Sequence, residues 1–521
     1  MKNPGINEGK AGRRKFAISH GLFCISYTSF LYIIYNSLNA DKITKWFYLG
    51  DKIDYLTLAA FLIIGLCTSI AAITLLIHPR ITKPLAIIFI ILSGIAAYFA
   101  AKYNAVIDRG MIMNAVHTDP SEVHSLLSRH MIPYVIFLII LPIIALSFIE
   151  VTFTNWKKYL LSSAKIIGLM LVISVALLYA RFDGISRAGN LSRKYIIHTL
   201  IPINYFQSFG SMIQHSVGSH FDRNKKPIEI SGSVTAQKDL VVVLAIGETS
   251  RQQNFSLYGY KRVNTNPVLS KEKNLHLLNG IARLGSTLYA LPEILMKQDI
   301  PLAAITSKLG INTSCYVNYT LYGMCGAVGE TKVSNCKYGK DNCYDEDVLP
   351  LLSENLKSYS SGYRLVILHL GGGSHGPSYH ERYPPEFQKF KPMCLDADVV
   401  NHCTLEQLYN SYDNTILYVD NVVGKIVGKL DKSGVPYVFI YLSDHGESLM
   451  EDGRIFHGMP PGISLPSEQA HIPLIVKSSL PITIEKRQEY GQQDVFDTIL
   501  SLLSIESKVH DKDKNFINLQ K

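Results

Sequence analysis

Polar residues capable of chemistry gather in three glycine-containing clusters in the second half of the chain. The clusters span Gly247–Ser250, Gly371–Pro377 and Ser443–Ser448. Asp444 and His445 place a carboxylate beside an imidazole, and Glu248 stands at the matching position of the first cluster. Two carboxylates and one imidazole that leave a fourth position open are a typical ligand set for a catalytic zinc ion. A helix cap at Asp444 would explain one cluster but not three, so we predict that Glu248, Asp444 and His445 bind metal.

A candidate nucleophile lies in the segment Gly285-Ser286-Thr287, directly ahead of a predicted helix. A hydroxyl that contacts a metal ion loses its proton more readily, which makes an alkoxide available near neutral pH. The N-terminus of a helix also favours phosphate binding. Serine or threonine at this place is equally an ordinary N-cap, and the residues alone do not choose between Ser286 and Thr287.

Two further histidines stand beside glycine and proline in predicted loops. They are His375 in Ser-His-Gly-Pro and His457 in Phe-His-Gly-Met-Pro. A histidine so placed can bind a phosphoryl oxygen, transfer a proton or hold a second zinc ion. The alternative is an exposed loop histidine without a role, but two in similar glycine contexts favour function.

The elements that must position these residues are three buried strands. The apolar runs Asp239–Ile246, Arg364–Leu370 and Tyr437–Leu442 each end at one of the three clusters. Fully apolar strands that alternate with helical stretches indicate an α/β domain with a mostly parallel sheet. In such a sheet the site lies at the carboxyl ends of the strands, so we expect the three clusters to meet there.

The first third of the chain predicts a membrane domain. Five apolar runs are long enough to cross a bilayer, which takes about 20 residues. They lie at 16–37, 55–77, 85–103, 132–152 and 160–180. We therefore predict a transmembrane domain over 1–181, an amphipathic bridging segment and linker over 182–238, and a catalytic domain over 239–521.

Basic residues predict the orientation of these spans. The N-terminus, Arg80 with Lys83, and Lys157 with Lys158 fall on one side if there are five spans, and that side is expected to be cytoplasmic. Everything after residue 181 then lies outside the cytoplasm. The net charge of +9 is explained by such anchoring or by contact with lipid head groups. The chain carries no arginine-rich tract that would indicate a nucleic-acid partner.

The cysteines agree with this orientation. Six lie in the predicted catalytic domain and form three close pairs, whereas Cys24 and Cys67 lie within predicted spans. Near-neighbour pairs in a domain outside the cytoplasm indicate disulfides, and the alternative of a thiolate zinc site lacks paired Cys-x-x-Cys motifs. The expected pairs are Cys315 with Cys325, Cys336 with Cys343, and Cys394 with Cys403.

The order of the motifs carries a family resemblance over nearly the whole chain. The motifs are Gly-Glu-Thr-Ser-Arg (247–251), Asn254, Gly-Tyr (259–260), Ser-Thr (286–287), Ser-His-Gly-Pro (374–377), Arg-Tyr-Pro (382–384), Ser-Tyr-Asp-Asn (411–414), Ser-Asp-His-Gly-Glu-Ser (443–448) and His-Gly-Met-Pro (457–460). The chain resembles the lipid A phosphoethanolamine transferases, which include the mobile colistin-resistance enzymes. The resemblance implies an alkaline phosphatase/sulfatase-like α/β/α domain behind a five-helix transmembrane domain.

The resemblance also implies roles for single residues. Glu248, Asp444 and His445 would bind the catalytic zinc together with Thr287, the nucleophile that is modified covalently. Substrate contacts would come from both halves of the chain. These residues are His375, Glu447 and His457 in the catalytic domain, and Asn114, Thr118 and Glu122 at four-residue steps in the second outer loop. Asp119-Pro120-Ser121-Glu122 also fits the start of a helix with a capping box.

The implied reaction takes phosphoethanolamine from phosphatidylethanolamine and leaves diacylglycerol. The acceptor would be a phosphate of lipid A or a sugar of the lipopolysaccharide core, and the outcome would be resistance to polymyxin. The enzyme would be a monomer in the inner membrane with its catalytic domain in the periplasm. Residues 280–285 lack the cysteine that many relatives use to bridge the nucleophile loop, and Glu293 follows Pro292. We therefore expect packing to hold that loop.

Three alternatives remain at this level. A phosphoglycerol transferase of the lipoteichoic acid synthase type shares the architecture but uses another lipid head group. A sulfatase would need a Cys/Ser-x-Pro-x-Arg segment, which the chain lacks. A membrane receptor with a degenerate enzyme fold would have lost a ligand or the nucleophile, and all of these residues are present.

Overall fold

The structure is a computed structural model. It describes residues 16–49, 51–103, 107, 112, 129, 131–153, 155–186, 188, 198–208, 210–211, 230–318, 321–333, 344–371, 373–396, 398–459 and 461–520. The chain divides into two compact units. Met1–Arg109 and Arg129–Met212 form the helical unit, and Gly110–Ser128 and Ile213–Lys521 form the α/β unit.

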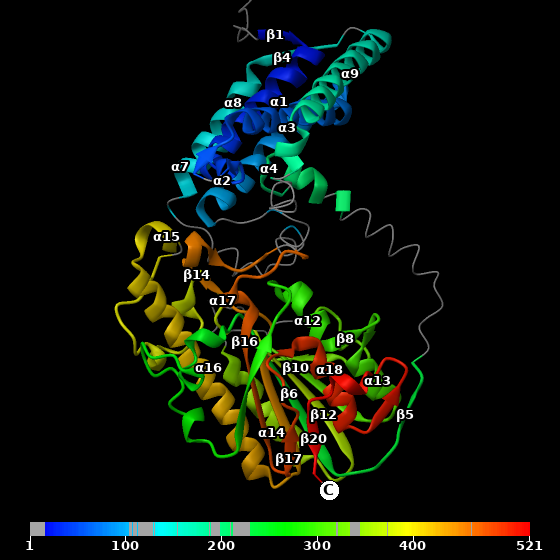
Figure 1. Cartoon of the computed structure of the whole chain (residues 1–521), viewed down its shortest axis with the longest axis vertical. Coiled ribbons are helices and arrows are strands. Elements are labelled where there is room, and N and C mark those ends of the chain that lie inside the picture. Colours follow the sequence, from blue (N-terminus) through cyan, green and yellow to red (C-terminus); the bar gives the residue numbers. More distant parts are fainter. Residues whose placement is uncertain are drawn as a thin grey trace, which may run out of the picture. The chain divides into compact units, whose positions relative to one another are not determined.

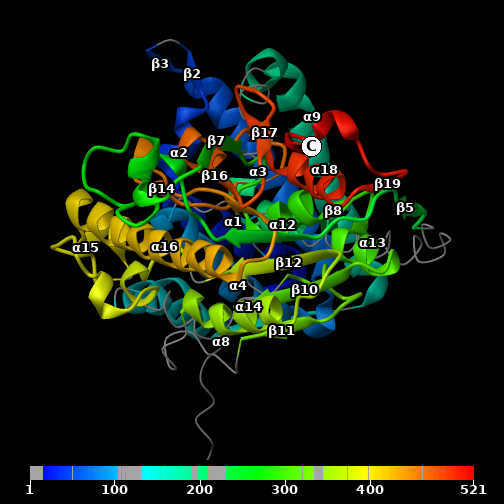
Figure 2. The same cartoon turned by 90° about the horizontal axis from the view of Figure 1, so that it is seen from below.

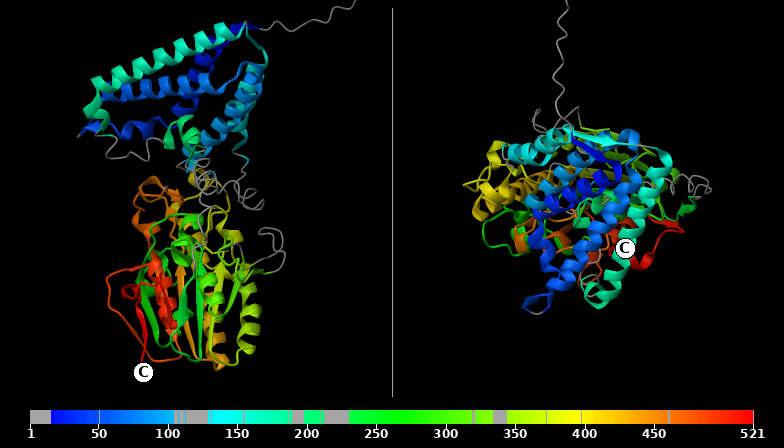
Figure 3. Two further views of the ribbon diagram at one scale, coloured as in Figure 1. Left: turned by 90° about the vertical axis from the view of Figure 1, so that its right-hand side faces the viewer. Right: turned by 90° about the horizontal axis from the view of Figure 1, so that it is seen from above.

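Each of the five predicted spans falls on helical segments of the helical unit. The segments are α1 (His20–Ser37), α3 (Tyr55–Leu76), α4 (Thr82–Tyr103), the run of α7 (Met131–Val135), η2 (Ile136–Ile140) and α8 (Leu141–Ser147), and α9 (Trp156–Ala180). Within the described residues, three helices are long and apolar enough to cross a membrane: Tyr55–Leu76, Pro79–Tyr103 and Trp156–Ala180. The run Met131–Ser147 is a shorter apolar helix. Figure 3 shows α3 and α9 side by side. The count of five spans stays a prediction.

Two predicted span ends are strands instead of helix. β1 (Phe16–Ser19) pairs in parallel with β4 (Ile149–Thr152). The alternating β-branched residues of β4 favour an extended backbone, and pairing satisfies the backbone groups that a helix would otherwise bond. α1 begins only after β1, where the Ser19 side chain accepts from the Leu22 amide.

The helical unit also includes part of the predicted bridging segment. The Asn36 side chain in α1 donates to the Ile201 carbonyl at 2.7 Å and accepts from the Ile201 amide at 3.0 Å. The Tyr205 hydroxyl lies 3.1 Å from Ser93 Oγ of α4. These buried bonds attach residues 201–205 to α1 and α4, since buried polar groups in folded proteins are paired. The predicted domain limits remain a prediction.

The α/β unit is built on an eight-stranded sheet with the order β11-β10-β12-β6-β13-β16-β7-β18. β16 is antiparallel to both of its neighbours, and the other pairings are parallel. The strands are β6 (Leu240–Gly247), β7 (Leu275–Ile281), β10 (Asn312–Val317), β11 (Glu330–Lys332), β12 (Tyr363–Leu370), β13 (Tyr437–Ser443), β16 (His471–Ser478) and β18 (Tyr490–Gly491). The mostly parallel sheet agrees with the prediction, and the three predicted strands are its adjacent central members β12, β6 and β13.

Helices cover both faces of this sheet (Figures 1 and 2). One face carries α12 (Thr287–Leu295), α13 (Leu302–Lys308) and α18 (Gln492–Leu502), whose apolar residues join those of β6, β12 and β13 in one core. The opposite face carries α14 (Val348–Lys357) and the long α16 (Leu405–Ser433). α16 begins with a capping box between Thr404 and Gln407, and it ends at Gly434 with φ of 69°. The result is the predicted α/β/α layering.

Short elements complete the α/β unit. They are β5 (Gly232–Val234), β8 (Met296–Lys297), β9 (Ile300–Pro301), β14 (Ser448–Leu449), β15 (Ile455–Phe456), α15 (Val399–His402), α17 (Ser467–Ala470), β17 (Ile482–Ile484), β19 (Ile505–Ser507) and β20 (Ile517–Leu519). β14 and β15 form an antiparallel hairpin whose C-terminal end leads directly to His457.

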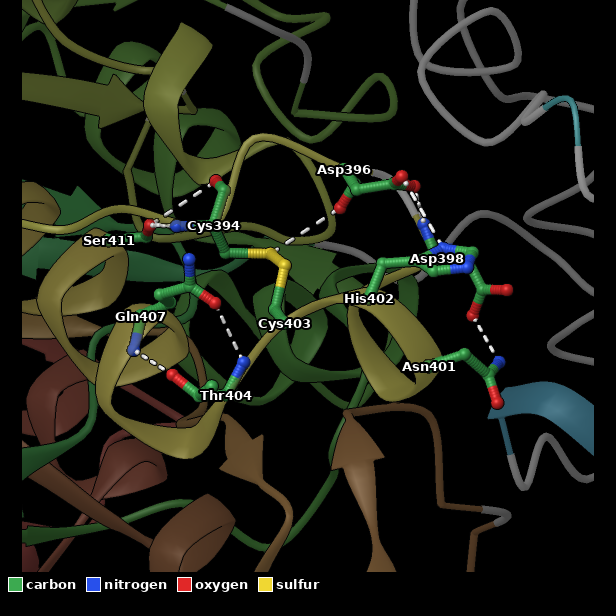
Figure 4. The surroundings of a disulfide bond; sticks show 9 residues. All are labelled: Cys394, Asp396, Asp398, Asn401, His402, Cys403, Thr404, Gln407 and Ser411. Carbon is green, nitrogen blue, oxygen red and sulfur yellow. Dashed lines mark hydrogen bonds and ion pairs between the residues drawn. A yellow bond between two sulfur atoms is a disulfide. The ribbon is translucent and has the colours of Figure 1, made fainter.

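Two of the three expected disulfides are formed, Cys315–Cys325 and Cys394–Cys403. Figure 4 shows the second, which closes the loop that carries α15 and ends at the capping box of α16. Cys336 and Cys343 lie outside the described residues. Cys24 and Cys67 are buried free thiols in α1 and α3, as expected of residues within the spans.

Candidate active site

The three polar clusters meet because their strands are neighbours in register. Gly247, the last residue of β6, lies opposite Leu370 of β12 on one side and Ser443 of β13 on the other. The Asp444 amide donates to the Gly247 carbonyl at 3.0 Å, which extends this pairing one residue beyond the strands. The residues that follow these strands therefore emerge at a common edge of the sheet.

Glu248, Asp444 and His445 form a buried cluster at this edge. One ligand atom from each lies within 4.8 Å of the others. His445 Nε2 is 3.2 Å from Asp444 Oδ2 and 3.7 Å from Glu248 Oε1. No other group of three such ligands occurs among the residues that the structure describes. The sequence prediction of these three residues as neighbours is therefore supported by the geometry.

The hydrogen bonds around this cluster leave its candidate metal-ligand atoms facing one another. Asp444 Oδ1 accepts from the Thr249 and His445 amides at 3.0 and 2.8 Å, whereas Asp444 Oδ2 has no hydrogen-bond partner among the described residues. His445 Nδ1 lies 3.0 Å from the Gly446 carbonyl, which can only accept, so the proton belongs on Nδ1. The lone pair of Nε2 then points among carboxylate oxygens. Buried lone pairs that converge in this way need a cation, and the donor set suits zinc.

Thr287 brings its hydroxyl to the same cluster. It is the first residue of α12, and its Oγ1 lies 3.0 and 3.2 Å from the two carboxylate oxygens of Glu248 and 3.5 Å from His445 Nε2. Ser286 precedes the helix at the N-cap position, and its side chain makes no capping bond. The geometry thus places the Thr287 hydroxyl against the metal-binding candidates.

Packing holds the loop before Thr287, as expected from its lack of cysteine. The Gly285 carbonyl accepts from the Gly458 amide at 2.8 Å. A Cβ at Gly285 would lie 2.9 Å from a Leu465 methyl carbon and 3.1 Å from Gln469 Oε1. Only glycine fits there without displacing these neighbours, so the segment that follows His457 fixes the start of α12.

His375 and His457 lie together beside the cluster. The ring centroid of His457 is 4.8 Å from that of His375 and 4.4 Å from that of His445. Burial lowers the pKa of His375 well below its usual value, and His457 and Arg382 lower it further. His375 is therefore a neutral imidazole at neutral pH, and its Nδ1 lies 2.6 Å from the Gly376 carbonyl, so Nδ1 carries the proton and Nε2 can accept one.

Glu447 lies next to His457. Its side chain is fully buried, with Oε1 accepting from the Tyr379 hydroxyl at 2.9 Å and Oε2 2.7 Å from His457 Nδ1. Both carboxylate oxygens thus contact protein groups, and the expected substrate contact of Glu447 stays a prediction. Asn114, Thr118 and Glu122, the expected contacts of the outer loop, lie outside the described residues.

Arg251 ends the motif Gly-Glu-Thr-Ser-Arg, and the sequence pattern indicates no role for it. Its buried guanidinium is 2.6 Å from Glu451 Oε1 and donates to the Asn254 side chain at 2.5 Å. It also stacks over the rings of Tyr409 and Tyr412, at 5.3 and 5.5 Å from their centroids. Glu451 lies 200 residues along the chain from Arg251, so no spacing within the motif could reveal the pair.

Two protein-family profiles match the chain. The profile described as Sulfatase matches residues 241–505, which covers the α/β unit from β6 onward. The profile described as Phosphoethanolamine transferase EptA/EptB matches residues 66–217, within the first half of the chain. The same chain thus matches the sulfatase profile in its second half and the phosphoethanolamine transferase profile in its first half.

Individual relatives agree with this division. Phosphoethanolamine transferase EptA of Escherichia coli strain K12 is 30% identical over 474 residues, which cover 82% of this chain and 84% of the relative. Phosphatidylethanolamine transferase Mcr-1 of Escherichia coli is 26% identical over 88% of this chain and 89% of its own. The solved structure of the integral membrane lipooligosaccharide phosphoethanolamine transferase A from Neisseria meningitidis shares the fold, with a TM-score of 0.83 at 24% identity over 96% of this chain and 98% of that one. The chain belongs to the phosphoethanolamine transferase family.

Proposed function

We propose that this protein transfers phosphoethanolamine from phosphatidylethanolamine to lipid A or the lipopolysaccharide core, by way of Thr287. Family membership supports the phosphoethanolamine group over the phosphoglycerol of the alternative transferase. A degenerate receptor would lack a ligand or the nucleophile, and Glu248, Thr287, Asp444 and His445 all converge in one buried cluster. The addition of a cationic group to lipopolysaccharide weakens its attraction for cationic peptides, which would give resistance to polymyxin.

The observation that carries the proposal is the position of Thr287 Oγ1, 3.0 Å from Glu248 Oε1 at the N-terminus of α12. In the first half-reaction Oγ1 bonds to the phosphorus of the donor, and the bond from phosphorus to the diacylglycerol oxygen breaks. The threonine hydroxyl loses one proton, and the diacylglycerol oxygen gains one, so the step is balanced. Amides at the helix N-terminus face the phosphoryl oxygens and offset their charge.

Glu248, Asp444 and His445, with Thr287, are the residues that would hold zinc. A zinc ion held there would lower the pKa of the hydroxyl and neutralise negative charge on the phosphoryl group. The residues behind the cluster keep its ligands in place: the Thr249 amide fixes one oxygen of Asp444, and the Gly446 carbonyl fixes His445.

In the second half-reaction an acceptor phosphate or hydroxyl attacks the phosphoethanolamine-threonine, and Thr287 regains its proton. His375 and His457 lie side by side next to His445 and are placed to contact the substrate and to take the proton of the attacking acceptor. The two half-reactions share one site, which gives ping-pong kinetics.

The setting of the reaction follows from the chain's two units. We propose five spans with the N-terminus in the cytoplasm, so that the catalytic domain, residues 239–521 with the linker before it, lies in the periplasm. The disulfides Cys315–Cys325 and Cys394–Cys403 support an oxidising compartment. Tethering to the inner membrane keeps the site near its lipid donor. Among the described residues, one chain supplies Glu248, Thr287, Asp444 and His445, in line with the proposed monomer.

The test is mass spectrometry of lipopolysaccharide from a Gram-negative strain that lacks its own transferases. Wild-type protein should add phosphoethanolamine to lipid A or core, and Thr287→Ala should add none. Ser286→Ala is the matched control, because it removes the hydroxyl next to Thr287 in the sequence and leaves Thr287 unchanged, and it should retain transfer. Equal modification by Thr287→Ala and wild type would refute the nucleophile. Unmodified lipopolysaccharide with well-expressed wild type would refute the acceptor.

A further inference from the structure

Two of the three histidines of the site are held in the same manner, and the third differs. His375 and His445 each place Nδ1 against the carbonyl of the next residue, at 2.6 and 3.0 Å. His457 instead places Nδ1 2.7 Å from a carboxylate oxygen of Glu447. A carboxylate only accepts, so the proton of a neutral His457 belongs on Nδ1. The lone pair of Nε2 is then the part of the ring that can accept a proton from a substrate group.

Glu447 is itself fixed in place. The Tyr379 hydroxyl donates to its other carboxylate oxygen at 2.9 Å, and both side chains are fully buried. A Cβ at Gly376 would lie 2.7 Å from the Tyr379 hydroxyl, so the glycine of the Ser-His-Gly-Pro loop makes room for this contact. The Arg251 guanidinium donates to the Glu447 carbonyl at 3.2 Å, which holds the backbone. The carboxylate can therefore not turn away from His457.

The backbone around His457 is held just as firmly. Phe456 adopts φ of +62°, a left-handed conformation that is rare for an aromatic residue and is characteristic of functional sites. Its carbonyl accepts from the Gln469 side chain at 3.0 Å, and the amide of Gly458, the residue after His457, donates to the Gly285 carbonyl at 2.8 Å. With the backbone fixed on both sides, the orientation of the ring depends on Glu447.

We propose that Glu447, held by Tyr379, is a positioning residue that determines which ring nitrogen of His457 faces the substrate. Glu447 touches no reacting atom, and it acts by keeping the proton on Nδ1, so that Nε2 can take the proton of the attacking acceptor. The role rests on the proposed function, in which His457 assists the second half-reaction. A carboxylate that orients a histidine through Nδ1 is a recurrent solution in catalysis and in metal sites.

Glu447→Gln changes this hydrogen bond without changing the volume of the side chain. If the amide oxygen keeps its bond from Tyr379, the amide nitrogen meets His457 Nδ1 and can only donate. Nδ1 must then accept, and the ring proton moves to Nε2. The kinetics are measured with full-length, zinc-loaded enzyme and phosphatidylethanolamine vesicles. We expect kcat to fall about 10–100-fold, as for other residues that support a functional histidine, with zinc content unchanged.

Glu468→Gln is the matched control. Glu468 is a second buried glutamate of the same region, and it accepts from Ser448 Oγ at 2.8 Å. The same substitution there removes a buried charge without a change at His457, and kcat should stay near the wild-type value. An equal loss in both variants would mean that any buried charge in this region matters alike, and it would overturn the specific role of Glu447.

A double-mutant cycle with His457→Asn separates positioning from general structural support. If Glu447 acts through His457, the double variant should be no slower than His457→Asn alone, because the partner is already absent. If Glu447 only supports the fold, the two losses should multiply. Multiplied losses, or wild-type kcat in Glu447→Gln, would overturn the proposal. Tyr379→Phe should give a smaller loss than Glu447→Gln, and one that is likewise absent in the His457→Asn background.

A second measurement does not depend on the reaction. Nitrogen-15 NMR of histidine-labelled, full-length protein reports which ring nitrogen carries the proton. We expect the His457 proton on Nδ1 in wild type and on Nε2 in Glu447→Gln. The same tautomer in both would refute the positioning role even if transfer is observed. Wild-type protein that shows the expected tautomers but transfers no phosphoethanolamine would instead refute the proposed function.

Discussion

The helical unit and the α/β unit differ in which side chains they expose and which they bury. α9 of the helical unit exposes Leu169, Val172 and Tyr179 by 57, 67 and 88%. In the α/β unit, the large apolar side chains exposed among the described residues are only Leu277, Leu395 and Leu405. The α/β unit instead buries charge, with Glu248, Asp444 and Glu447 at its centre.

The difference shows what each unit requires from outside the chain. An apolar exterior is stable against lipid, because lipid tails need no hydrogen bonds from it. A buried cluster of carboxylates is stable only with a compensating cation or hydrogen-bond donors. Exposed apolar side chains in the helical unit therefore imply a membrane, and buried carboxylates in the α/β unit imply a metal ion.

The largest effect is expected from neutralising the charge of the buried cluster. Asp444→Asn removes one anionic ligand while its amide oxygen can still accept from the Thr249 and His445 amides. We expect zinc binding to weaken and transfer to fall by about 10³-fold or more, beyond the 10–100-fold typical of residues behind a ligand. Metal analysis and a head-group transfer assay measure both.

The same change should stabilise the metal-free protein. With zinc removed by a chelator, repulsion between Asp444 and Glu248 is uncompensated, and its relief should raise the free energy of unfolding by about 1 kcal/mol. Thermal unfolding of the chelated wild type and variant tests this. Undiminished zinc content, or a less stable metal-free variant, would show that Asp444 has a structural role instead of a metal-binding one.

Much of this site was predictable from local pattern. Each of β6, β12 and β13 is a short run of buried apolar residues that ends in glycine and polar residues, and neighbouring parallel strands end at one edge. The sequence alone could therefore predict that Glu248, Asp444 and His445 lie close together at this edge. Thr287 needed the family resemblance, since a hydroxyl before a helix looks the same as a cap.

The residues that support the site were not predictable in this way. Glu447 reads as one more polar residue of the third cluster, and only its contacts show that Tyr379 and His457 occupy both its oxygens. Arg251 and Glu451 are brought together by the fold across 200 residues. In the helical unit, hydropathy located the helices. It did not reveal the β1–β4 pair or the hydrogen bonds of Asn36, because the periodicity of a sequence does not show which distant segments contact each other.

Whether lipid covers the helical unit can be tested by introducing one charged residue on the exterior of each unit. Leu169→Arg, near the middle of α9, should reduce membrane insertion by about 2.5–3.5 kcal/mol, the cost of arginine at the centre of a span. Leu277→Arg at the exposed edge of the α/β unit should change stability by less than about 0.5 kcal/mol. The yield of membrane-integrated protein and its thermal unfolding measure both. Equal tolerance at the two positions would contradict a lipid-facing α9.

Removal of a disulfide tests what the α/β unit gains from an oxidising environment. The double variant Cys394→Ser/Cys403→Ser opens the loop shown in Figure 4, whose ends are nine residues apart in sequence. Loss of this cross-link should lower the free energy of unfolding by about 2–3 kcal/mol. Denaturant unfolding under oxidising conditions should show the loss. Unfolding equal to that of wild type would mean that the capping box and hydrogen bonds around the loop suffice to hold it.

A smaller effect is expected from the buried ion pair of Arg251 with Glu451. Arg251 is almost fully buried, and Glu451, its ion-pair partner at 2.6 Å, is 28% exposed. Glu451→Gln leaves the guanidinium with aromatic rings and neutral acceptors. The free energy of unfolding at neutral pH should fall by about 1–2 kcal/mol, less than for a fully buried pair because water screens Glu451 in part. Asp452→Asn is the matched control, since the next residue is 85% exposed and should change stability little.

The pH dependence of this effect has a definite sign. Burial acts to raise the pKa of Glu451, but the charge and hydrogen bond of Arg251 outweigh it, and the pKa lies below its usual 4.5. An acid whose pKa is lowered by folding stabilises the protein above its unfolded pKa, and this contribution is lost as the pH falls through its folded pKa. The stability difference between wild type and Glu451→Gln should therefore be constant from neutral pH to about 5 and shrink below 4.5. Thermal unfolding across this range measures it, and a difference that grows on acidification would show that Arg251 does not depend on Glu451 for its charge compensation.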